Sequence, residues 1–473
     1  MIFANIVLYS WPLVVLALFK KFSKSAALLV TIIAGYLFLP SVLSFDLPAL
    51  PSLDKHTIPA ISAFLIILML GTQSTQDSLP GWLPQRPLPK ALTLLLLAAA
   101  IFTVLTNGDA LFYGPVVLPA LRPWDALSIV LTALIMLLPF FLGRKFLASP
   151  KQQRLFLVAL LGTGLAYSLL ALYEIRMSPQ LNAMVYGFFP HDWLQHIRND
   201  GFRPIVFLTH GLRVSIFFTG CMLAAFGLAR VTKGPLSIAA LGAGAWLFIT
   251  LFLSKSLGAL AIGSILLPVV LFTTTRQQLL IASSLAAVVL LYPMLRGTNL
   301  IPVEQITAWA ESISAERAQS FTFRLGNEEL LLNRAAERPL FGWGGWGRNF
   351  VFGPDGSEIS YVADGYWILV IGQGGWIKYL AEFGLLCLPA FVGFLRSKQF
   401  QLGMETSVLV IILVSSLIDL IPNATISPLT WLLAGSLWAG WNWGMLQNPR
   451  TPPHRPRPKH PGPPFHAMPN PRP

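Results

Sequence analysis

The sequence is poor in charge, in cysteine and in familiar catalytic motifs. Only 11% of its 473 residues are charged, whereas an ordinary soluble domain has roughly a quarter. Its two cysteines, Cys221 and Cys387, lie inside apolar runs, so we predict core residues and no disulfide framework. No HExxH, CxxC, P-loop or Rossmann signature occurs, which excludes the enzyme classes that depend on them.

Apolar residues, by contrast, make up 55% of the chain, and the mean hydropathy is +0.65. A membrane-spanning helix needs roughly 20 of them, and a membrane β-barrel would show short alternating segments instead. We predict an all-α polytopic integral membrane protein with about 12–13 transmembrane helices. The third and fourth predicted spans are short, which favours tilted or partly re-entrant segments. The spans are expected near residues 2–19, 26–43, 57–72, 91–106, 126–143, 155–173, 205–229, 235–253, 256–274, 278–295, 376–395, 404–421 and 425–446.

Every second loop between these spans is basic, from Lys20 and Lys21 after the first span to Arg396 and Lys398 after the eleventh. Cytoplasmic loops carry an excess of lysine and arginine. We therefore expect the basic loops in the cytoplasm, the N-terminus outside and the C-terminus inside. This bias, together with a basic tail, accounts for the net charge of +13 without a nucleic-acid partner.

The chain divides into three parts on this basis. Residues 1–173 are N-terminal transmembrane helices, and residues 174–446 form a transmembrane core with outward loops at 174–204 and 296–375. Residues 447–473 are rich in proline and arginine, a composition typical of a disordered polyproline II tail. Its cations either contact anionic lipid headgroups or are simply solvated.

The outward loop at 296–375 is the longest polar interval. Helical spacing of Ile306, Trp309, Ala310 and Ile313 predicts a helix over about 301–336. The sequence Arg-Pro-Leu-Phe-Gly-Trp-Gly-Gly at 338–345 should end it. Glycines 372, 374 and 375 interrupt the next apolar run, so residues 366–371 are expected to form a separate turn that dips in beside a cavity. The simplest alternative is a plain surface loop.

Charged and polar groups recur near the outer ends of the predicted spans. Arg213 would lie roughly 12 Å below the outer surface of the span at 205–229. A charge there costs a few kcal/mol unless it faces a cavity or a partner. Taken together, these groups predict a polar cavity open to the outside, although each alone is compatible with snorkelling or a local ion pair. The others are His210, Lys255, Lys378, Glu382, Asp419 and Asn423.

Six arginines also persist in the 296–375 loop, on the side that the charge bias should deplete; they indicate a ligand or an ion-pair network. They are Arg296, Arg317, Arg324, Arg334, Arg338 and Arg348. Guanidinium groups bind phosphate oxygens in a bidentate manner, so a lipid-linked diphosphate is the expected ligand. The outward loops lack an Asp-x-Asp pair, so we predict metal-independent chemistry without a cofactor, in which cations neutralise the departing diphosphate.

Four segments carry a resemblance to a known family. They are RPIVFLTHGLRVSIFFTGCMLA, LSKSLGAL, SFTFRLGNEELLLNRAAERPLFGWGGWGRNF and ADGYWILVIGQGGWIKYLAEFGLL. In this order they resemble the bacterial O-antigen ligase and O-antigen polymerase superfamily, over about residues 200–400. That resemblance implies a multi-span inner-membrane protein with a large periplasmic loop and an active site that faces the periplasm.

The resemblance also assigns roles. Arg213 and Arg324 match arginines with which the family holds undecaprenyl diphosphate. Asp364-Gly365 stands where ligases have histidine and asparagine, so the general base is expected to be Asp364 or His210. The predicted catalytic residues are Arg213, Arg324 and Asp364, and no metal ligand is predicted. The predicted substrate-binding residues are Arg203, His210, Lys255, Arg338, Lys378 and Asp419.

We therefore expect inverting transfer of a glycan from undecaprenyl diphosphate to a hydroxyl of a glycan or lipid-linked acceptor. Polymerisation of O-antigen or exopolysaccharide repeat units is an alternative. A lipid-linked oligosaccharide flippase is an alternative of another class, but a transporter should have related halves and charges near the midplane, and we see no internal repeat. A non-catalytic assembly subunit is a third possibility.

Overall fold

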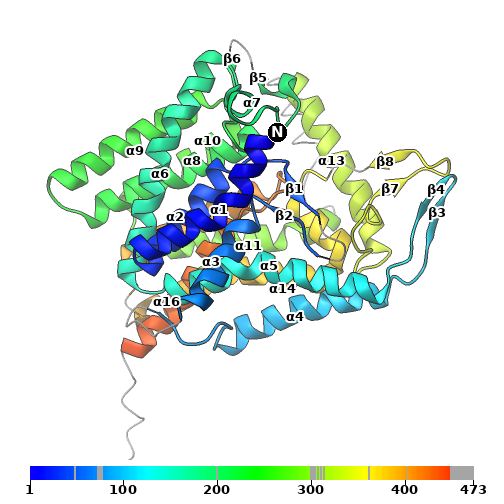
Figure 1. The fold of residues 1–473 in the computed structure, drawn as a ribbon, viewed down its shortest axis with the longest axis horizontal. Helices are drawn as coiled ribbons and strands as arrows, with labels where there is room; N and C mark the ends of the chain where they lie inside the picture. The colour runs from blue at the N-terminus through cyan, green and yellow to red at the C-terminus, as the bar shows by residue number, and fades with distance from the viewer. Residues whose placement is uncertain are drawn as a thin grey trace, which may run out of the picture.

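The structure, a computed structural model, describes residues 1–46, 50–71, 78–198, 201–298, 315–360, 363–400 and 402–447, with Gln305, Ala308 and Ser312. This part of the chain forms 15 α-helices and four small antiparallel hairpins (Figure 1). Most of the predicted tail and part of the predicted loop helix, including Ile306, Trp309, Ala310 and Ile313, lie outside the described residues.

The helices are α1 (Ile2–Lys21), α2 (Lys24–Phe38), α3 (Ile58–Met69), α4 (Pro87–Leu105), α5 (Pro123–Phe146), α6 (Pro150–Met177), α7 (Leu181–Tyr186), α8 (Gly211–Val231), α9 (Pro235–Leu253), α10 (Leu257–Phe272), α11 (Thr275–Gly297), α13 (Ala315–Ala336), α14 (Tyr366–Phe400), α15 (Met404–Asp419) and α16 (Pro428–Gln447). The hairpins pair β1 (Ser44–Phe45) with β2 (Leu53–Asp54), β3 (Leu111–Tyr113) with β4 (Val116–Leu118), β5 (Ile197–Arg198) with β6 (Gly201–Phe202), and β7 (Val351–Phe352) with β8 (Glu358–Ser360).

The predicted all-α membrane fold is confirmed. A helix occupies each of the thirteen positions where the sequence predicts a span. Eight helices in the described part are long and apolar enough to cross a bilayer: α1, α4, α5, α6, α8, α9, α11 and α14. Helices α2, α3 and α10 are apolar but shorter. Helix α3 is short as expected, whereas α4 has 19 residues and is not.

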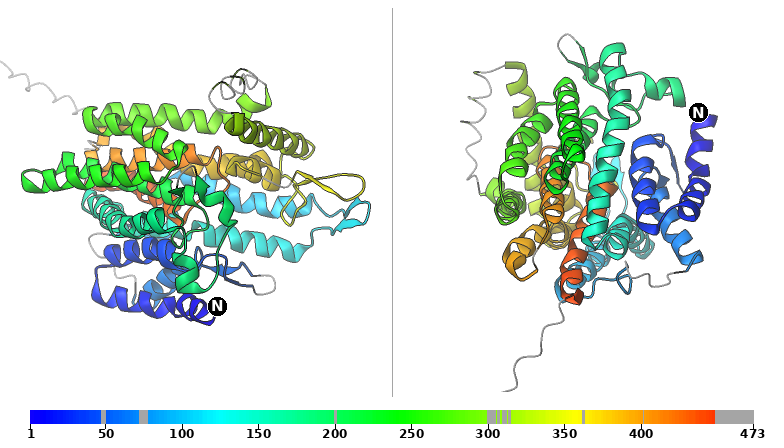
Figure 2. Two further views of the ribbon diagram at one scale, coloured as in Figure 1. Left: turned by 90° about the horizontal axis from the view of Figure 1, so that it is seen from above. Right: turned by 90° about the vertical axis from the view of Figure 1, so that its left-hand side faces the viewer.

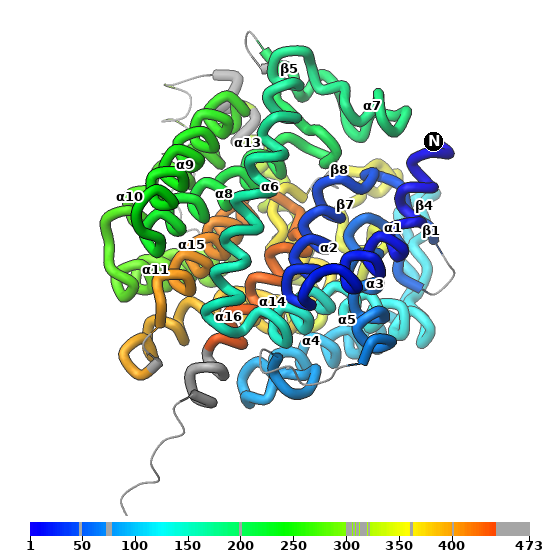
Figure 3. The backbone as a smooth tube through the Cα atoms, turned by 60° about the vertical axis from the view of Figure 1, so that its left-hand side comes forward, coloured from blue at the N-terminus to red at the C-terminus, as the bar shows by residue number. Residues whose placement is uncertain are grey.

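Helix α8 lies at the centre of the bundle. It packs against α6, α9, α10 and α15, and 83% of its most apolar 18-residue window is buried. Helix α6 stands between the N-terminal helices α1–α3 and the hairpin of α9 and α10 (Figures 2 and 3). Helices α5 and α16 are in close contact where Gly435 faces the Phe140 carbonyl: a Cβ added to that glycine would lie 2.0 Å from the carbonyl oxygen. Small residues permit such contacts between membrane helices.

The loops predicted to be basic gather at one end of the bundle, which we call the basic end. The Ser25 hydroxyl at the start of α2 donates to the Phe146 carbonyl at the end of α5, over 2.8 Å. Arg230, at the end of α8, donates to the Thr273 carbonyl after α10, over 2.5 Å. The long predicted loops lie at the opposite end, as the alternating charge pattern requires.

Helix α14 contains a break at the opposite end. Gly375 has non-helical dihedral angles (φ 66°, ψ −172°) inside α14. The sequence correctly predicts an interruption among these glycines. Residues 366–371 belong to a segment that is separate from the following helix, as predicted, but this segment is a short helix that continues up to the break rather than a single turn.

The backbone groups released by this break are bound by the 339–344 loop, the stretch that follows α13. The N–H groups of Trp343 and Gly344 donate to the carbonyls of Gly372 and Gln373, over 2.8 and 2.9 Å. In return, the N–H groups of Trp376 and Ile377 donate to the carbonyls of residues 339 and 340, over 2.8 and 3.2 Å. Buried backbone groups need such partners, so the break and the loop stabilise each other.

A buried ionic cluster fixes α13 against α11. The Arg296 guanidinium lies 3.9 Å from the Glu328 carboxylate and donates to the Leu325 carbonyl over 3.2 Å. Tyr292 donates to the same carboxylate over 3.3 Å. Burial raises the pKa of Glu328 to about 7. The predicted loop helix is thus confirmed in its second half, as an ordered helix that crosses the end of the bundle and stops before Pro339.

The glycines at the loop–break contact provide a test of this arrangement. Gly342 and Gly375 both have positive φ, and an added Cβ would lie 2.6 Å from the Gly374 nitrogen and 2.3 Å from the Leu340 carbonyl carbon, respectively. Gly342→Ala and Gly375→Ala should each lower the free energy of unfolding by at least about 1–3 kcal/mol, measured by thermal unfolding in detergent. Gly345→Ala is the matched control, because a Cβ added there would have nothing within 4 Å. Equal melting temperatures for all three variants would show that the close contact does not exist.

Candidate functional site

A cavity of about 600 Å³ opens at the end of the bundle opposite the basic end. Its polar lining comes from the end of α2, the connection after α7, the start of α8, the middle of α13, the stretch before α14, and the end of α15 with the turn that follows it. Its polar lining residues include Tyr36, His191, Gln195, His210, Arg213, Arg324, Asp364, Asp419, Asn423 and Thr425. Helix termini suit such a wall because their polar backbone groups already face away from the lipid.

Arg213 lines this cavity from the first turn of α8. Its Nη2 donates to the Thr425 hydroxyl over 2.7 Å, which holds the guanidinium against the turn after α15. The sequence places Arg213 deep in a span that starts near residue 205. The helix instead starts at Gly211, because residues 203–210 form an irregular segment, so Arg213 lies close to the helix end.

Arg324 and Asp364 meet in the lining of the same cavity. Arg324 projects from α13, and Asp364 lies two residues before α14. The Arg324 Nε and the Asp364 Oδ2 are 3.7 Å apart, and the two side chains are 37% and 23% exposed. Burial raises the pKa of Asp364 above its ordinary value, and the Arg324 charge opposes that shift. This long, partly solvated ion pair leaves the arginine hydrogen bonds available to a ligand.

Asp419 and His210 complete the set of predicted residues that reach the cavity. The Asp419 carboxylate, at the last residue of α15, accepts from the Asn423 amide over 2.8 Å. His210 is the N-cap of α8, and its Nδ1 accepts from the Leu212 N–H over 3.0 Å. Burial, reinforced by neighbouring histidines and arginines, lowers the pKa of His210 to about 3. A group that resists protonation so strongly is a weak general base, which favours Asp364 over His210 in that role.

Four predicted substrate-binding residues are absent from the described lining of this cavity. Arg203 donates to the Lys255 carbonyl over 3.1 Å, so these two lie together beside the 197–202 hairpin. Arg338 donates to the Thr106 carbonyl and to the side chains of Asn107 and Asp109, over 2.6–2.7 Å. These hydrogen bonds of Arg338 fix the 339–344 region to the end of α4. Lys378, the fourth of these residues, faces a second cavity of about 290 Å³ between α4, α5 and residues 344–346.

The sequence interpretation misses several lining residues. Tyr36 and Thr425 carry no local signal, since their role depends on contacts with distant parts of the chain. His191, and His196 next to it in space, could have been found from the sequence, because three of the seven histidines lie between residues 191 and 210.

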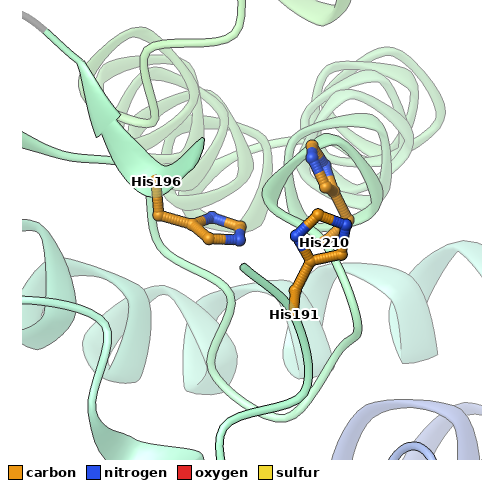
Figure 4. Close-up of side chains that lie close together, drawn as sticks. All are labelled: His191, His196 and His210. Atoms are coloured by element: carbon orange, nitrogen blue, oxygen red, sulfur yellow. The ribbon is translucent and has the colours of Figure 1, made fainter. Parts of the chain in front are cut away.

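These three histidines form a compact cluster. One ring nitrogen from each of His191, His196 and His210 lies within 4.8 Å of the others, and the rings face one another in Figure 4. The ring centroids are 4.9–5.6 Å apart, and the rings are nearly perpendicular or tilted to one another rather than stacked. His196 is fully buried, His210 is half-buried and His191 is exposed. Imidazoles in this arrangement could hold a metal ion.

Comparison with known proteins adds no assignment. No protein-family model matches the chain, and no curated protein matches it significantly.

Proposed function

We propose that the protein transfers a glycan from undecaprenyl diphosphate to a hydroxyl of a glycan or lipid-linked acceptor. The observation that carries the proposal is the convergence of Arg213, Arg324 and Asp364 on one cavity, although they come from α8, α13 and the stretch before α14. Two guanidinium groups and a carboxylate with a raised pKa are the groups that diphosphate binding and hydroxyl deprotonation need.

The composition of the cavity wall suits an amphiphilic donor. Its charged residues come from the ends of α8 and α15, from the middle of α13 and from the stretch before α14, whereas Leu160, Phe217, Ile412 and Leu433 continue the wall into the apolar bundle. A volume of about 600 Å³ is within the ordinary range for ligand sites, roughly 300–1,000 Å³. A diphosphate would bind among the charges and an isoprenoid tail would extend along the apolar wall.

The ion pair of Arg324 with Asp364 suggests how donor binding and catalysis are coupled. When the diphosphate enters, Arg324 exchanges its carboxylate partner for phosphate oxygens, which bind a planar guanidinium in a bidentate way. Asp364 is then released to accept the proton of the acceptor hydroxyl. The hydroxyl oxygen attacks the anomeric carbon, the bond to the diphosphate oxygen breaks, and the lipid diphosphate leaves with its charge neutralised by Arg213 and Arg324. This single displacement inverts the anomeric configuration.

The distribution of charge favours transfer over lipid flipping. A transporter needs its binding groups near the midplane, between related halves. Arg213 and Asp419 instead lie at a helix start and a helix end, both at the same end of the bundle. We further propose that this end faces the periplasm of a bacterial inner membrane, because the opposite end carries the basic loops.

Arg324 is expected to act through its planar fork of hydrogen-bond donors. Arg324→Lys and Arg324→Ala should both weaken binding of undecaprenyl diphosphate by about 10–100-fold, the value of a charge-assisted hydrogen bond, measured with purified protein in detergent. The exposed Arg176 at the end of α6, outside the cavity lining, provides the control: Arg176→Ala should bind normally. Normal binding by Arg324→Lys would show that Arg324 contributes only its positive charge and not its planar set of hydrogen-bond donors.

Asp364 is expected to act as the general base. Asp364→Asn should retain donor binding but lower the rate of glycan transfer by about 10²–10⁴-fold, measured as product formed per purified enzyme. If Asp364 only caps the following helix, asparagine will replace it well. Near-normal transfer by this variant would therefore shift the search for the base to Asp419.

The proposed orientation can be tested by cysteine labelling. Ser357 is exposed in the loop between β7 and β8, and Lys233 is exposed at the basic end, whereas both native cysteines are buried. In cells with a permeable outer membrane, Ser357→Cys should react with a membrane-impermeant thiol reagent and Lys233→Cys should not. The reverse pattern would place the cavity on the cytoplasmic side.

A further inference from the structure

We propose that His191, His196 and His210 bind a late first-row divalent metal ion, with Zn²⁺ as the most suitable, at the mouth of the 600 Å³ cavity. The inference rests on the three imidazoles alone and goes beyond the proposed function, which assigns the transfer chemistry to arginine and aspartate. Imidazole is a good ligand for zinc and its neighbours, whereas Mg²⁺ and Ca²⁺ prefer oxygen.

The local fold explains why the histidines converge. His191 lies in the connection after α7, His196 ends the 3-10 turn Trp193–His196, and His210 caps α8. The β5–β6 hairpin reverses the chain between them, and the Arg203 N–H donates to the His196 carbonyl over 2.8 Å. This hairpin brings the start of α8 back beside His196, so three side chains from a single 20-residue segment share one volume.

The distances fit a site that closes on its ion. Zinc–nitrogen bonds of about 2.0–2.1 Å in a tetrahedron require ligand nitrogens about 3.4 Å apart, and the present nitrogens lie within 4.8 Å of one another. Metal binding therefore requires the nitrogens to approach one another by up to about 1.4 Å. His191 is the least constrained of the three, because it is exposed in an irregular connection, whereas His196 is buried and His210 caps α8.

The hydrogen bonding of His210 shows which of its ring nitrogens could bind a metal. A neutral imidazole offers a lone pair to a metal. The Leu212 N–H already uses the Nδ1 lone pair of His210. Binding of the metal through Nε2 would require the imidazole proton to move from Nε2 to Nδ1, and a bond to the metal would then replace that capping hydrogen bond.

The position of the cluster gives the ion an exposed side. His191 and His210 line the main cavity, whereas His196 lies behind them. Three protein ligands leave at least one coordination position for water or another oxygen. The ion would also tie the 191–196 segment to the start of α8, and so fix one edge of the cavity mouth.

Zinc binding by the full-length protein tests the proposal. The protein should be purified in detergent with an affinity tag that contains no histidine, so that the tag itself binds no metal. His454, His460 and His466 in the C-terminal segment of the chain offer other ligands, so they are replaced in a separate variant. Metal content after dialysis against Zn²⁺, and the visible absorption spectrum after loading with Co²⁺, report occupancy and coordination. We expect a single tightly held Zn²⁺ and the absorption typical of tetrahedral Co²⁺.

Three variants decide the outcome. His191→Ala should weaken Zn²⁺ binding by more than about 100-fold, because loss of even an outer hydrogen-bonding partner costs 10–100-fold. His210→Asn should do the same while it preserves the cap of α8, since asparagine is a good N-cap. Combined alanine substitution of His454, His460 and His466 should leave this Zn²⁺ in place. Equal Zn²⁺ affinity in the wild type and His191→Ala, or loss of all binding with the C-terminal histidines, would overturn the proposal.

Discussion

The exchange of backbone hydrogen bonds between the 339–344 loop and the break in α14 is the contact on which the end of the bundle opposite the basic end depends. A helix that breaks inside a membrane protein exposes carbonyl and N–H groups that lipid cannot satisfy. The loop satisfies four of them and is itself held by α4, since Thr103 and Asn107 donate to the carbonyls of Phe341 and Gly342 over 2.7 and 2.9 Å. The end of α13 and the start of α14 are thereby brought together, and with them Arg324 and Asp364.

The same end of the bundle separates structural arginines from those available to a ligand. Arg296, Arg334 and Arg338 each donate hydrogen bonds to several protein groups or lie in ion pairs, and the fully buried Arg348 donates to the carbonyls of Pro119 and Trp343. Among the described residues, Arg324 forms one long ion pair and lines the cavity, and Arg213 donates to one hydroxyl group. A guanidinium with few protein partners can give its hydrogen bonds to phosphate without leaving a buried group unsatisfied.

The cavity and the histidine cluster share the start of α8, so residues in the first turn of that helix have several structural roles at once. His210 caps the helix, joins the cluster and lines the cavity, and Arg213 follows it within the same turn. The irregular segment before α8 makes this possible, because it places polar side chains at the bundle end rather than in the lipid. The Glu174 carboxylate supports that segment by accepting from the N–H groups of Ile205 and Val206, over 2.8 and 2.7 Å.

The helices follow from the sequence alone, because the length of each apolar run is a local property that burial in lipid requires. The interruption near Gly375 and the excess of arginine in the 296–375 loop can also be predicted from the sequence. Clustered glycines are unusual in an apolar run, and arginines are unusual in a loop that the charge bias places outside. Which groups satisfy the break, which arginine faces the cavity and which histidines meet become known only in the folded bundle. Those outcomes depend on contacts between distant residues, such as Arg213 with Thr425, 212 positions away. No local pattern encodes such a pairing, because packing of the whole bundle decides it.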